Sequence, residues 1–260
     1  MIFDTHCHIY DSKYEESIDE IVYKCLSFDV GLMMVVGDNI FDSKKCDEIS
    51  KQYNEVYSAV GVHPEEVDTD DFDKMEEQLT SLVLNNKKIK AIGEIGLDYY
   101  WKNDEDTKAK QKKYFIKQIE IANKLDLPII IHARDSVTDC IEILKEHPCF
   151  NKGVFHCFSG SVEQAQIIIK LGYYIGLDGP VTYKNSKTPK EVARIVPSDK
   201  LVIETDSPYL PPVPYRGKTN YPYYCKEIIQ EIANIREVDY KEIEELTYEN
   251  GKRLFKIWKV

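Results

Sequence analysis

His6 and His8 are the first residues in the chain whose types and spacing could do metal chemistry. They lie two positions apart just after the apolar pair Ile2-Phe3, which predicts that they stand at the carboxyl end of a short strand. Alternate side chains of an extended backbone share one face, so both imidazoles are expected to point the same way. Two neutral imidazoles with a carboxylate nearby make half of a divalent-metal site. Alone the pair is a weak signal, because two-residue metal motifs occur by chance.

Four further candidate ligands follow other apolar runs, at the expected ends of later strands: Glu94, His132, His156 and Asp206. His63 stands at the end of another predicted strand. Five of the six histidines therefore stand at predicted strand ends, and only His147, in a helix-to-strand connection, does not. Packing or solubility alone is a poor explanation for such a distribution. The shared position predicts that these side chains converge on one rim.

The elements that must position these residues alternate along the whole chain. Apolar runs predict strands, after the first one at residues 2–3, over residues 32–37, 56–62, 89–93, 128–131, 153–155, 174–177 and 201–205. Amphipathic stretches predict helices between them, over residues 18–26, 43–53, 75–83, 114–125, 137–144, 162–171 and within 225–258. Asp11 or Ser12 is expected to cap the first helix and Gly31 to close it.

Near-continuous apolar strands that alternate with helices indicate a parallel sheet whose faces are covered. About eight such units in 260 residues favour one α/β domain over residues 1–260, a single (β/α)8 TIM-type barrel. In such a barrel the site lies at the C-terminal ends of the strands, where the candidate ligands stand.

The ligand types suggest a site for two ions. Metal pairs ~3.5–4 Å apart clamp the attacking and leaving oxygens of a displacement. Nitrogen-rich ligation favours zinc or another late transition metal, while carboxylates and water admit magnesium or manganese. The predicted ligands divide between the ions as follows: His6, His8 and Asp206 for one, His132 and His156 for the other, and Glu94 shared by both.

Six motifs carry a family resemblance: Asp4–His8 (DTHCH), Gly61–Pro64 (GVHP), Gly93–Tyr100 (GEIGLDYY), Ile131–Arg134 (IHAR), Phe155–Gly160 (FHCFSG) and Glu204–Pro212 (ETDSPYLPP). In this order they resemble the TatD family of metal-dependent deoxyribonucleases, which belongs to the amidohydrolase-like barrels. The resemblance extends from Asp4 to Phe255 and implies a TIM-type barrel that hydrolyses phosphodiester bonds, most commonly as a 3′-exonuclease on DNA. One departure is Glu65-Glu66, where family members often place another histidine, which puts a peripheral substrate contact in doubt.

Position also suggests roles for the polar residues of this rim. Asp206 is the natural base to orient a metal-activated water. Arg134 and Arg216 could balance the charge of a phosphate or serve as surface ion-pair partners. The phosphate role is favoured for Arg134, two residues from the candidate ligand His132, and neither role is favoured for Arg216. His63 could touch phosphate, protonate the leaving oxygen or simply be a satisfied rim histidine. Glu204, two residues before Asp206, is expected to support the ligands rather than bind a further ion.

Other residues near the motifs have simpler interpretations. The aromatic residues Tyr99, Tyr100 and Trp101 could stack on bases, but covering the rim is the commoner role after a strand. Cys7 and Cys157 flank candidate ligands, and alternation along an extended backbone predicts that both point away from the metal, into packing.

Composition and charge limit the environment and the partners. Seven scattered cysteines, never spaced CxxC, indicate reduced thiols in the cytoplasm. A signal segment and an apolar run long enough for a bilayer are both missing, so no membrane association is expected. The sequence also gives no sign of an obligate protein partner. The net charge of −11 counts against broad binding to duplex DNA, because nucleic-acid binders usually carry a basic face.

The sequence thus predicts a metal-dependent deoxyribonuclease. We expect two divalent ions (zinc, magnesium or manganese). The resemblance implies 3′–5′ exonuclease action, and the acidic net charge favours single-stranded DNA or frayed ends over intact duplex. The alternative is an amidohydrolase-type hydrolase of a small-molecule amide, ester or lactone. Such relatives often bridge their ions with a carboxylated lysine, whereas Glu94 follows the fourth strand here. A metal-binding protein without catalysis is disfavoured by the complete ligand set and the candidate base.

Overall fold

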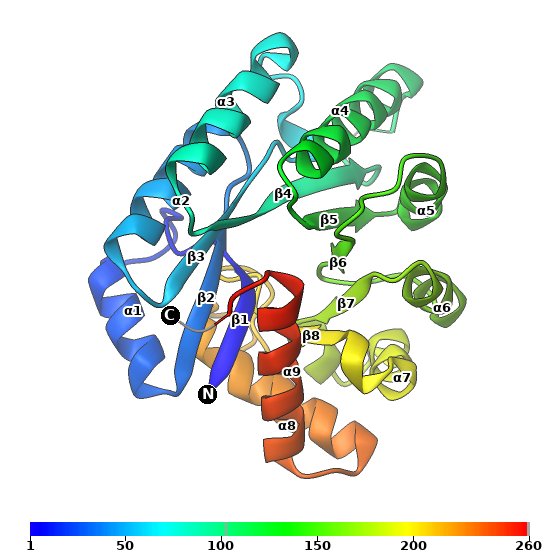
Figure 1. Ribbon diagram of the computed structural model, residues 1–260. Helices are drawn as coiled ribbons and strands as arrows, with labels where there is room; N and C mark the ends of the chain where they lie inside the picture. The colour runs from blue at the N-terminus through cyan, green and yellow to red at the C-terminus, as the bar shows by residue number, and fades with distance from the viewer. Residues whose placement is uncertain (102, 259–260) are drawn as a thin grey trace. The chain divides into compact units, whose positions relative to one another are not determined.

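The computed structural model describes residues 1–101 and 103–258 (Figure 1). Eight strands form one sheet in sequential order, and helices alternate with them, which confirms the predicted (β/α)8 class. The strands are β1 (Ile2–Cys7), β2 (Val30–Val36), β3 (Val56–Val60), β4 (Ile89–Asp98), β5 (Ile129–Arg134), β6 (Gly153–Phe155), β7 (Tyr174–Leu177) and β8 (Leu201–Ile203).

The α-helices are α1 (Ile18–Ser27), α2 (Ile40–Gln52), α3 (Phe72–Asn85), α4 (Glu105–Lys124), α5 (Val137–Glu146), α6 (Val162–Lys170), α7 (Lys187–Ile195), α8 (Cys225–Arg236) and α9 (Tyr240–Leu254). Short 3-10 turns lie at Pro64–Glu66, Gly179–Thr182, Ser198–Lys200 and Pro222–Tyr224. None of these described helices is both long and apolar enough to span a bilayer.

The chain divides into two compact units. The first unit comprises residues 1–35, 157–169 and 174–260, and the second comprises residues 36–156 and 170–173. The first therefore holds β1, β7 and β8, and the second holds β3 to β6. Each unit is described by itself below.

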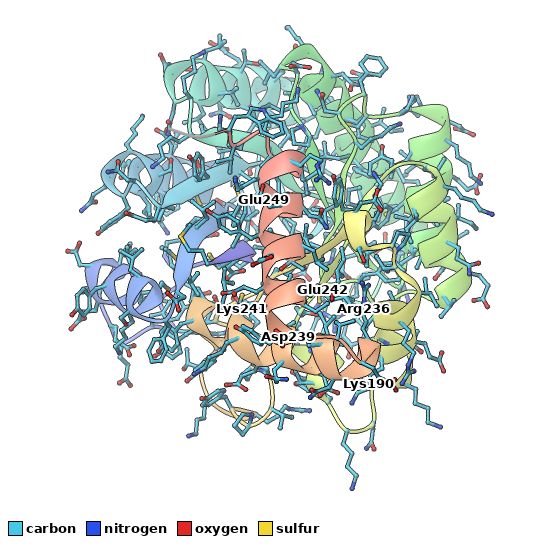
Figure 2. All side chains as sticks on the ribbon, turned by 60° about the horizontal axis from the view of Figure 1, so that its bottom comes forward. Lys190, Arg236, Asp239, Lys241, Glu242 and Glu249 are labelled. Atoms are coloured by element: carbon cyan, nitrogen blue, oxygen red, sulfur yellow. The ribbon has the colours of Figure 1, made fainter. Side chains whose placement is uncertain are left out.

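In the first unit, α9 packs against β1, and the two lie side by side in Figure 1. The close approach depends on Gly251, because a Cβ there would lie 2.6 Å from the Phe3 ring. Helices α7 and α8 are linked by Arg236, at the end of α8. Its guanidinium donates hydrogen bonds to the carbonyl oxygens of Ala193 and Val196 at the end of α7. Figure 2 shows α9 rising from Asp239, its N-terminal cap, beside Arg236.

In the second unit, two buried glutamines of α4 hold the ends of β3 and β4. Gln118 accepts from the Val62 backbone N–H at 2.7 Å and donates to its carbonyl oxygen at 3.0 Å. Gln111 makes the same pair of hydrogen bonds with the backbone of Asp98, both at 3.0 Å. Each side-chain amide thus pairs with a buried backbone N–H and a buried carbonyl oxygen. These hydrogen bonds fix the strand ends and leave few buried polar atoms unsatisfied.

Several predicted boundaries were wrong. β4 runs on to Asp98 rather than ending at Gly93, because it continues to pair with β5 as far as Arg134. The N-cap of α1 is Ser17, in a reciprocal capping box with Glu20, and not Asp11 or Ser12. The helix ends at the C-cap Phe28, before Gly31 is reached, and α7 was not predicted at all.

Candidate metal centre

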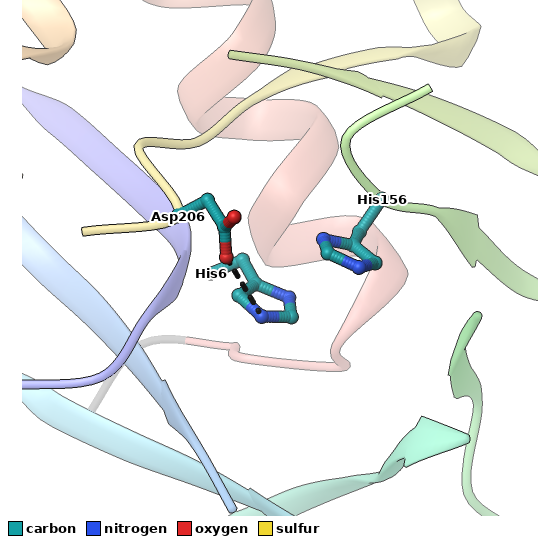
Figure 3. Close-up of side chains that lie close together, drawn as sticks. All are labelled: His6, His156 and Asp206. Carbon is teal, nitrogen blue, oxygen red and sulfur yellow. Dashed lines mark ion pairs between the residues drawn. The ribbon is translucent and has the colours of Figure 1, made fainter. Parts of the chain in front are cut away.

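The first unit brings His6, His8 and Asp206 together at the ends of β1 and β8. The two imidazole Nε2 atoms lie 3.1 Å apart. One carboxylate oxygen of Asp206 lies 3.7 Å from His6 Nε2 and 3.5 Å from His8 Nε2; Figure 3 marks the His6–Asp206 pair with a dashed line. Backbone hydrogen bonds from Asp206 N to His6 O and from His8 N to Ser207 O hold the two segments in register. Three convergent donors of this kind suit a divalent cation.

Asp4, the carboxylate closest in sequence to these histidines, binds the backbone that supports the cluster. Its Oδ1 accepts from the backbone N–H groups of His6 and Thr205, and its Oδ2 accepts from the Thr205 hydroxyl at 2.5 Å. Because both oxygens are used in this buried place, Asp4 positions β1 against the segment that leads to Asp206.

Glu204 is buried and also supports this cluster. Its Oε1 accepts from the Cys157 backbone N–H, and its Oε2 lies 3.4 Å from the Thr5 hydroxyl. Gly176 of β7 makes room for it, because a Cβ there would lie 2.9 Å from both carboxylate oxygens. These contacts suit the supporting role predicted for Glu204.

The prediction that Cys157 points into packing is wrong. Its Sγ and carboxylate oxygens of Asp178 and Asp206 all lie within 4.8 Å of one another. Burial, reinforced by the nearby carboxylates, raises the pKa of this thiol well above its usual value. Cys7, by contrast, is buried and its Sγ contacts the carbonyl oxygen of Met34, as expected for a packing residue.

The second unit gathers three histidines around the buried carboxylate of Glu94. Glu94 Oε1 lies 2.6 Å from His156 Nε2 and 2.7 Å from His132 Nδ1. His63 Nε2 is farther from the same oxygen, at 3.6 Å, and the His63 ring meets the His132 ring edge-on at 4.3 Å. His63, Glu94 and His132 thus form a second cluster with the donor types of a divalent-metal site.

Asp98 is a member of this cluster that sequence reasoning missed. Its Oδ2 lies 2.9 Å from His132 Nε2, so His132 stands between two carboxylates. A signal was available, because Glu94, Gly96 and Asp98 alternate along one face of β4. Gly96 has φ +145°, and a Cβ there would lie 2.0 Å from the His132 carbonyl oxygen, so only glycine allows this close pairing.

The electrostatics around His132 favour a cation. Burial alone would lower the pKa of His132, but its contacts with Asp98 and Glu94 outweigh burial and raise that pKa to about 9. Burial likewise opposes the charge on Asp98, and the hydrogen bond and charge of His132 nevertheless hold the pKa of Asp98 below its usual value. Because a metal ligand must be deprotonated, a metal ion would have to compete with the proton on His132, and metal binding would release it.

We expect Asp98→Asn to weaken metal binding about 10- to 100-fold, because the carboxylate that orients a ligating histidine also raises its basicity. Titration calorimetry with manganese or zinc measures the affinity. Asp73→Asn, which changes an exposed acid of α3, is the control. Unchanged affinity in Asp98→Asn would show that this contact does not tune the ligand.

His63 is held neutral. Its Nδ1 accepts a hydrogen bond from the Glu65 backbone N–H at 3.2 Å, which leaves the proton on Nε2. Burial, reinforced by the nearby His132, lowers the pKa of His63 to about 3. A neutral imidazole of this kind can donate a hydrogen bond, but it holds no extra proton to give to a leaving group.

The two predicted arginines have different surroundings. Arg134 is exposed at the end of β5, two residues beyond His132, and its guanidinium carbon lies 3.7 Å from the centre of the Tyr100 ring. Arg216 is exposed in the loop after β8 and stacks on Tyr183, with its guanidinium carbon 4.0 Å from the ring centre.

Comparison with known proteins identifies the family of the chain. Residues 3–256 match the family model described as TatD related DNase. The chain belongs to the TatD family. It is 41% identical over 260 residues to the metal-dependent hydrolase YabD of Bacillus subtilis, covering 99% of this chain and 100% of that protein. It is 35% identical to the metal-dependent hydrolase YcfH of Escherichia coli K12, covering 98% and 96%.

A solved structure supports the same assignment. The crystal structure of YJJV, a TatD homologue from Escherichia coli K12, matches with a TM-score of 0.92 and 28% identity, covering 98% of each chain. The present TatD protein is therefore a metal-dependent hydrolase with the amidohydrolase-like barrel fold. The histidine and carboxylate donors of both units fit a divalent metal by their chemistry.

Proposed function

We propose that this TatD protein is a cytoplasmic deoxyribonuclease that removes nucleotides from the 3′ end of single-stranded or frayed DNA. The observation that carries the proposal is the second-unit cluster: Glu94 among three histidines, with exposed Arg134 two residues beyond the ligand His132. A phosphodiester needs a cationic partner beside the metal ligands, and a guanidinium matches phosphate geometry. The family description, TatD related DNase, supports the same substrate.

The proposed ligand sets follow the two clusters. His6, His8 and Asp206 would hold one ion, and His132, His156 and Glu94 would hold another, with Glu94 shared as the sequence predicts. Divalent ions supply, when bound, a water of lowered pKa and balancing charge for the phosphate.

The protein's own residues then have distinct tasks. Asp206 would orient the attacking water and accept its proton, because a carboxylate can do so at neutral pH. His63 donates a hydrogen bond from Nε2 to a phosphate oxygen; its low pKa argues against the alternative role of proton donor. Arg134 holds the phosphate, while Arg216, stacked on Tyr183, is a weaker candidate for the same task.

The decisive test is an assay of metal-free protein with single cations added back. The substrates are end-labelled single-stranded DNA and a panel of small amides, esters and lactones, and elemental analysis counts the bound ions. We expect metal-dependent release of nucleotides from the 3′ end and about two ions per chain. Turnover of an ester or lactone without cleavage of DNA would instead establish the small-molecule hydrolase.

The acidic charge of the protein predicts a shallow salt dependence of DNA binding. With a net charge of −11, long-range attraction cannot recruit DNA, so affinity must rest on a few local contacts. Each phosphate neutralised on a single strand contributes roughly −0.7 to the slope of log affinity against log salt. We expect a slope equivalent to only a few phosphates, and little cutting of closed circular duplex.

Arg134→Ala should remove about 0.7 from that slope and weaken binding to all sequences alike, because a phosphate contact carries no base information. Arg194→Ala, which changes an exposed arginine of α7, is the matched control. A steep slope with rapid cutting of circular duplex would point to an extended basic groove and contradict the end-directed proposal.

A further inference from the structure

Two aromatic side chains stand exposed just after β4. Tyr100 is 52% exposed and Trp101 is 65% exposed. Their rings meet edge-on, with centroids 4.6 Å apart. Such exposure is hard to reconcile with a role in covering the rim, because large aromatic rings gain stability from burial. The exposed rings are therefore accessible to a ligand.

The aromatic pair is tied to the metal-ligand cluster through Asp98. One oxygen of this buried carboxylate accepts from the Tyr100 backbone N–H at 2.9 Å, while the other contacts His132 Nε2 at 2.9 Å. A backbone hydrogen bond from Tyr99 N to Arg134 O, at 3.0 Å, fixes the same segment to the end of β5. The start of the aromatic pair is thus anchored to the strand that carries His132.

A cation lies on this aromatic surface. The guanidinium carbon of Arg134 is 3.7 Å from the centre of the Tyr100 ring and 5.5 Å from that of Trp101. Arg134 is itself exposed, so its donors remain accessible while its plane rests on Tyr100. An exposed π-face beside an accessible guanidinium offers the two contacts that a nucleotide needs, one for its base and one for its phosphate.

We propose that Tyr100, Trp101 and Arg134 form a nucleotide subsite, in which a DNA base stacks on Trp101 while Arg134 binds the adjoining phosphate. This inference rests on the proposed deoxyribonuclease function and adds a contact to the base. Every base has a π-face, so the subsite selects for a base without selecting which one. The protein should therefore distinguish an intact 3′-terminal strand from an abasic one.

Tryptophan fluorescence tests binding directly, because the chain has two tryptophans with nearly equal exposure: Trp101 at 65% and Trp258 at 66%. Trp258→Phe leaves Trp101 as the reporter, and Trp101→Phe leaves Trp258 as the matched control. The probes are a short phosphorothioate oligothymidylate and an abasic phosphorothioate of equal length, added to the metal-loaded protein. We expect the thymidylate alone to quench Trp101, and neither probe to quench Trp258. Equal quenching by both probes, or no quenching of Trp101, would overturn the inference.

Cleavage kinetics test the consequence for the substrate. Trp101→Ala should raise KM for single-stranded DNA by on the order of 5- to 100-fold, the range expected for loss of one stacked base. It should leave kcat nearly unchanged, and Trp101→Phe should restore most of the affinity. Because Trp101 is exposed, its replacement by alanine should leave the fold intact, and thermal unfolding of the variant checks this point.

The outcomes separate this inference from the function on which it rests. If the wild-type protein cuts DNA and Trp101→Ala has a wild-type KM, the subsite is wrong and the deoxyribonuclease stands. If Trp101 is quenched only by the oligothymidylate while DNA is not cut, the subsite stands and the proposed reaction fails. If DNA is neither bound at Trp101 nor cut, both are overturned.

Discussion

Asp206→Asn is expected to lower turnover on DNA by on the order of 10²–10⁴-fold, the usual contribution of a general base. Asparagine keeps the shape of the side chain but cannot accept a proton. It also suits the local backbone: Asp206 has φ +54°, a left-handed conformation that asparagine adopts more readily than most residues. The variant should therefore fold, which circular dichroism and thermal unfolding would check alongside kcat.

Asp199→Asn, which changes an exposed acid in the turn Ser198–Lys200, is the control for loss of one negative charge. It should have wild-type turnover. Metal content is measured for both variants, because Asp206 lies 3.5–3.7 Å from two candidate ligands and its replacement could also weaken the binding of a metal ion. A near wild-type rate in Asp206→Asn would remove this residue from the mechanism.

The sequence predicted the fold, and within each unit side chains that it grouped lie close together, for a simple physical reason. Parallel strands that alternate with helices have all their carboxyl ends at one edge of the sheet. Residues that directly follow different strands are therefore expected at that edge, even when they are far apart in sequence. His6 and Asp206 are separated by almost the whole chain and lie 3.7 Å apart. Alternation along β1 also placed His6 and His8 on one face, as expected.

The errors arose where a long-range contact or a backbone turn decides the outcome. β4 was predicted to end at Gly93, because its continuation to Asp98 depends on pairing with β5 and on hydrogen bonds with Gln111 of α4. Asp98 was missed for the same reason. Cys157 was misplaced because alternation was assumed for a residue that has φ +42°, beyond the end of β6. The Sγ atom of Cys157 consequently lies near the carboxylates of Asp178 and Asp206.

One error was avoidable from local sequence. Ser17 and Glu20 have the spacing of a capping box, yet the cap of α1 was sought earlier, at Asp11 or Ser12. The exposure of Tyr100 and Trp101, by contrast, could not be read from the sequence. An aromatic residue after a strand packs or stays exposed according to its neighbours, and the neighbour that matters here, Arg134, comes from another strand.

Glu94→Gln is expected to cause the other large loss. One carboxylate oxygen of Glu94 lies within 2.7 Å of two histidine nitrogens and 3.6 Å from a third, so a single charged oxygen faces all three imidazoles. Glutamine fills the same volume without the charge, and its amide group would turn a donor toward nitrogens meant to bind a cation. Loss of an ion removes several kcal/mol of transition-state stabilisation, so we expect turnover to fall by roughly 10²–10⁴-fold.

The sharper readout of Glu94→Gln is metal content, because Glu94 is predicted to be shared by both ions. Loss of more than one ion per chain, with retained folding, would support sharing; loss of only one would assign Glu94 to the His132–His156 ion alone. Glu120→Gln, which changes an exposed glutamate of α4, is the matched control and should keep wild-type metal and rate. If Glu94→Gln also keeps both, Glu94 is not a ligand, and the three histidines around it need a different explanation.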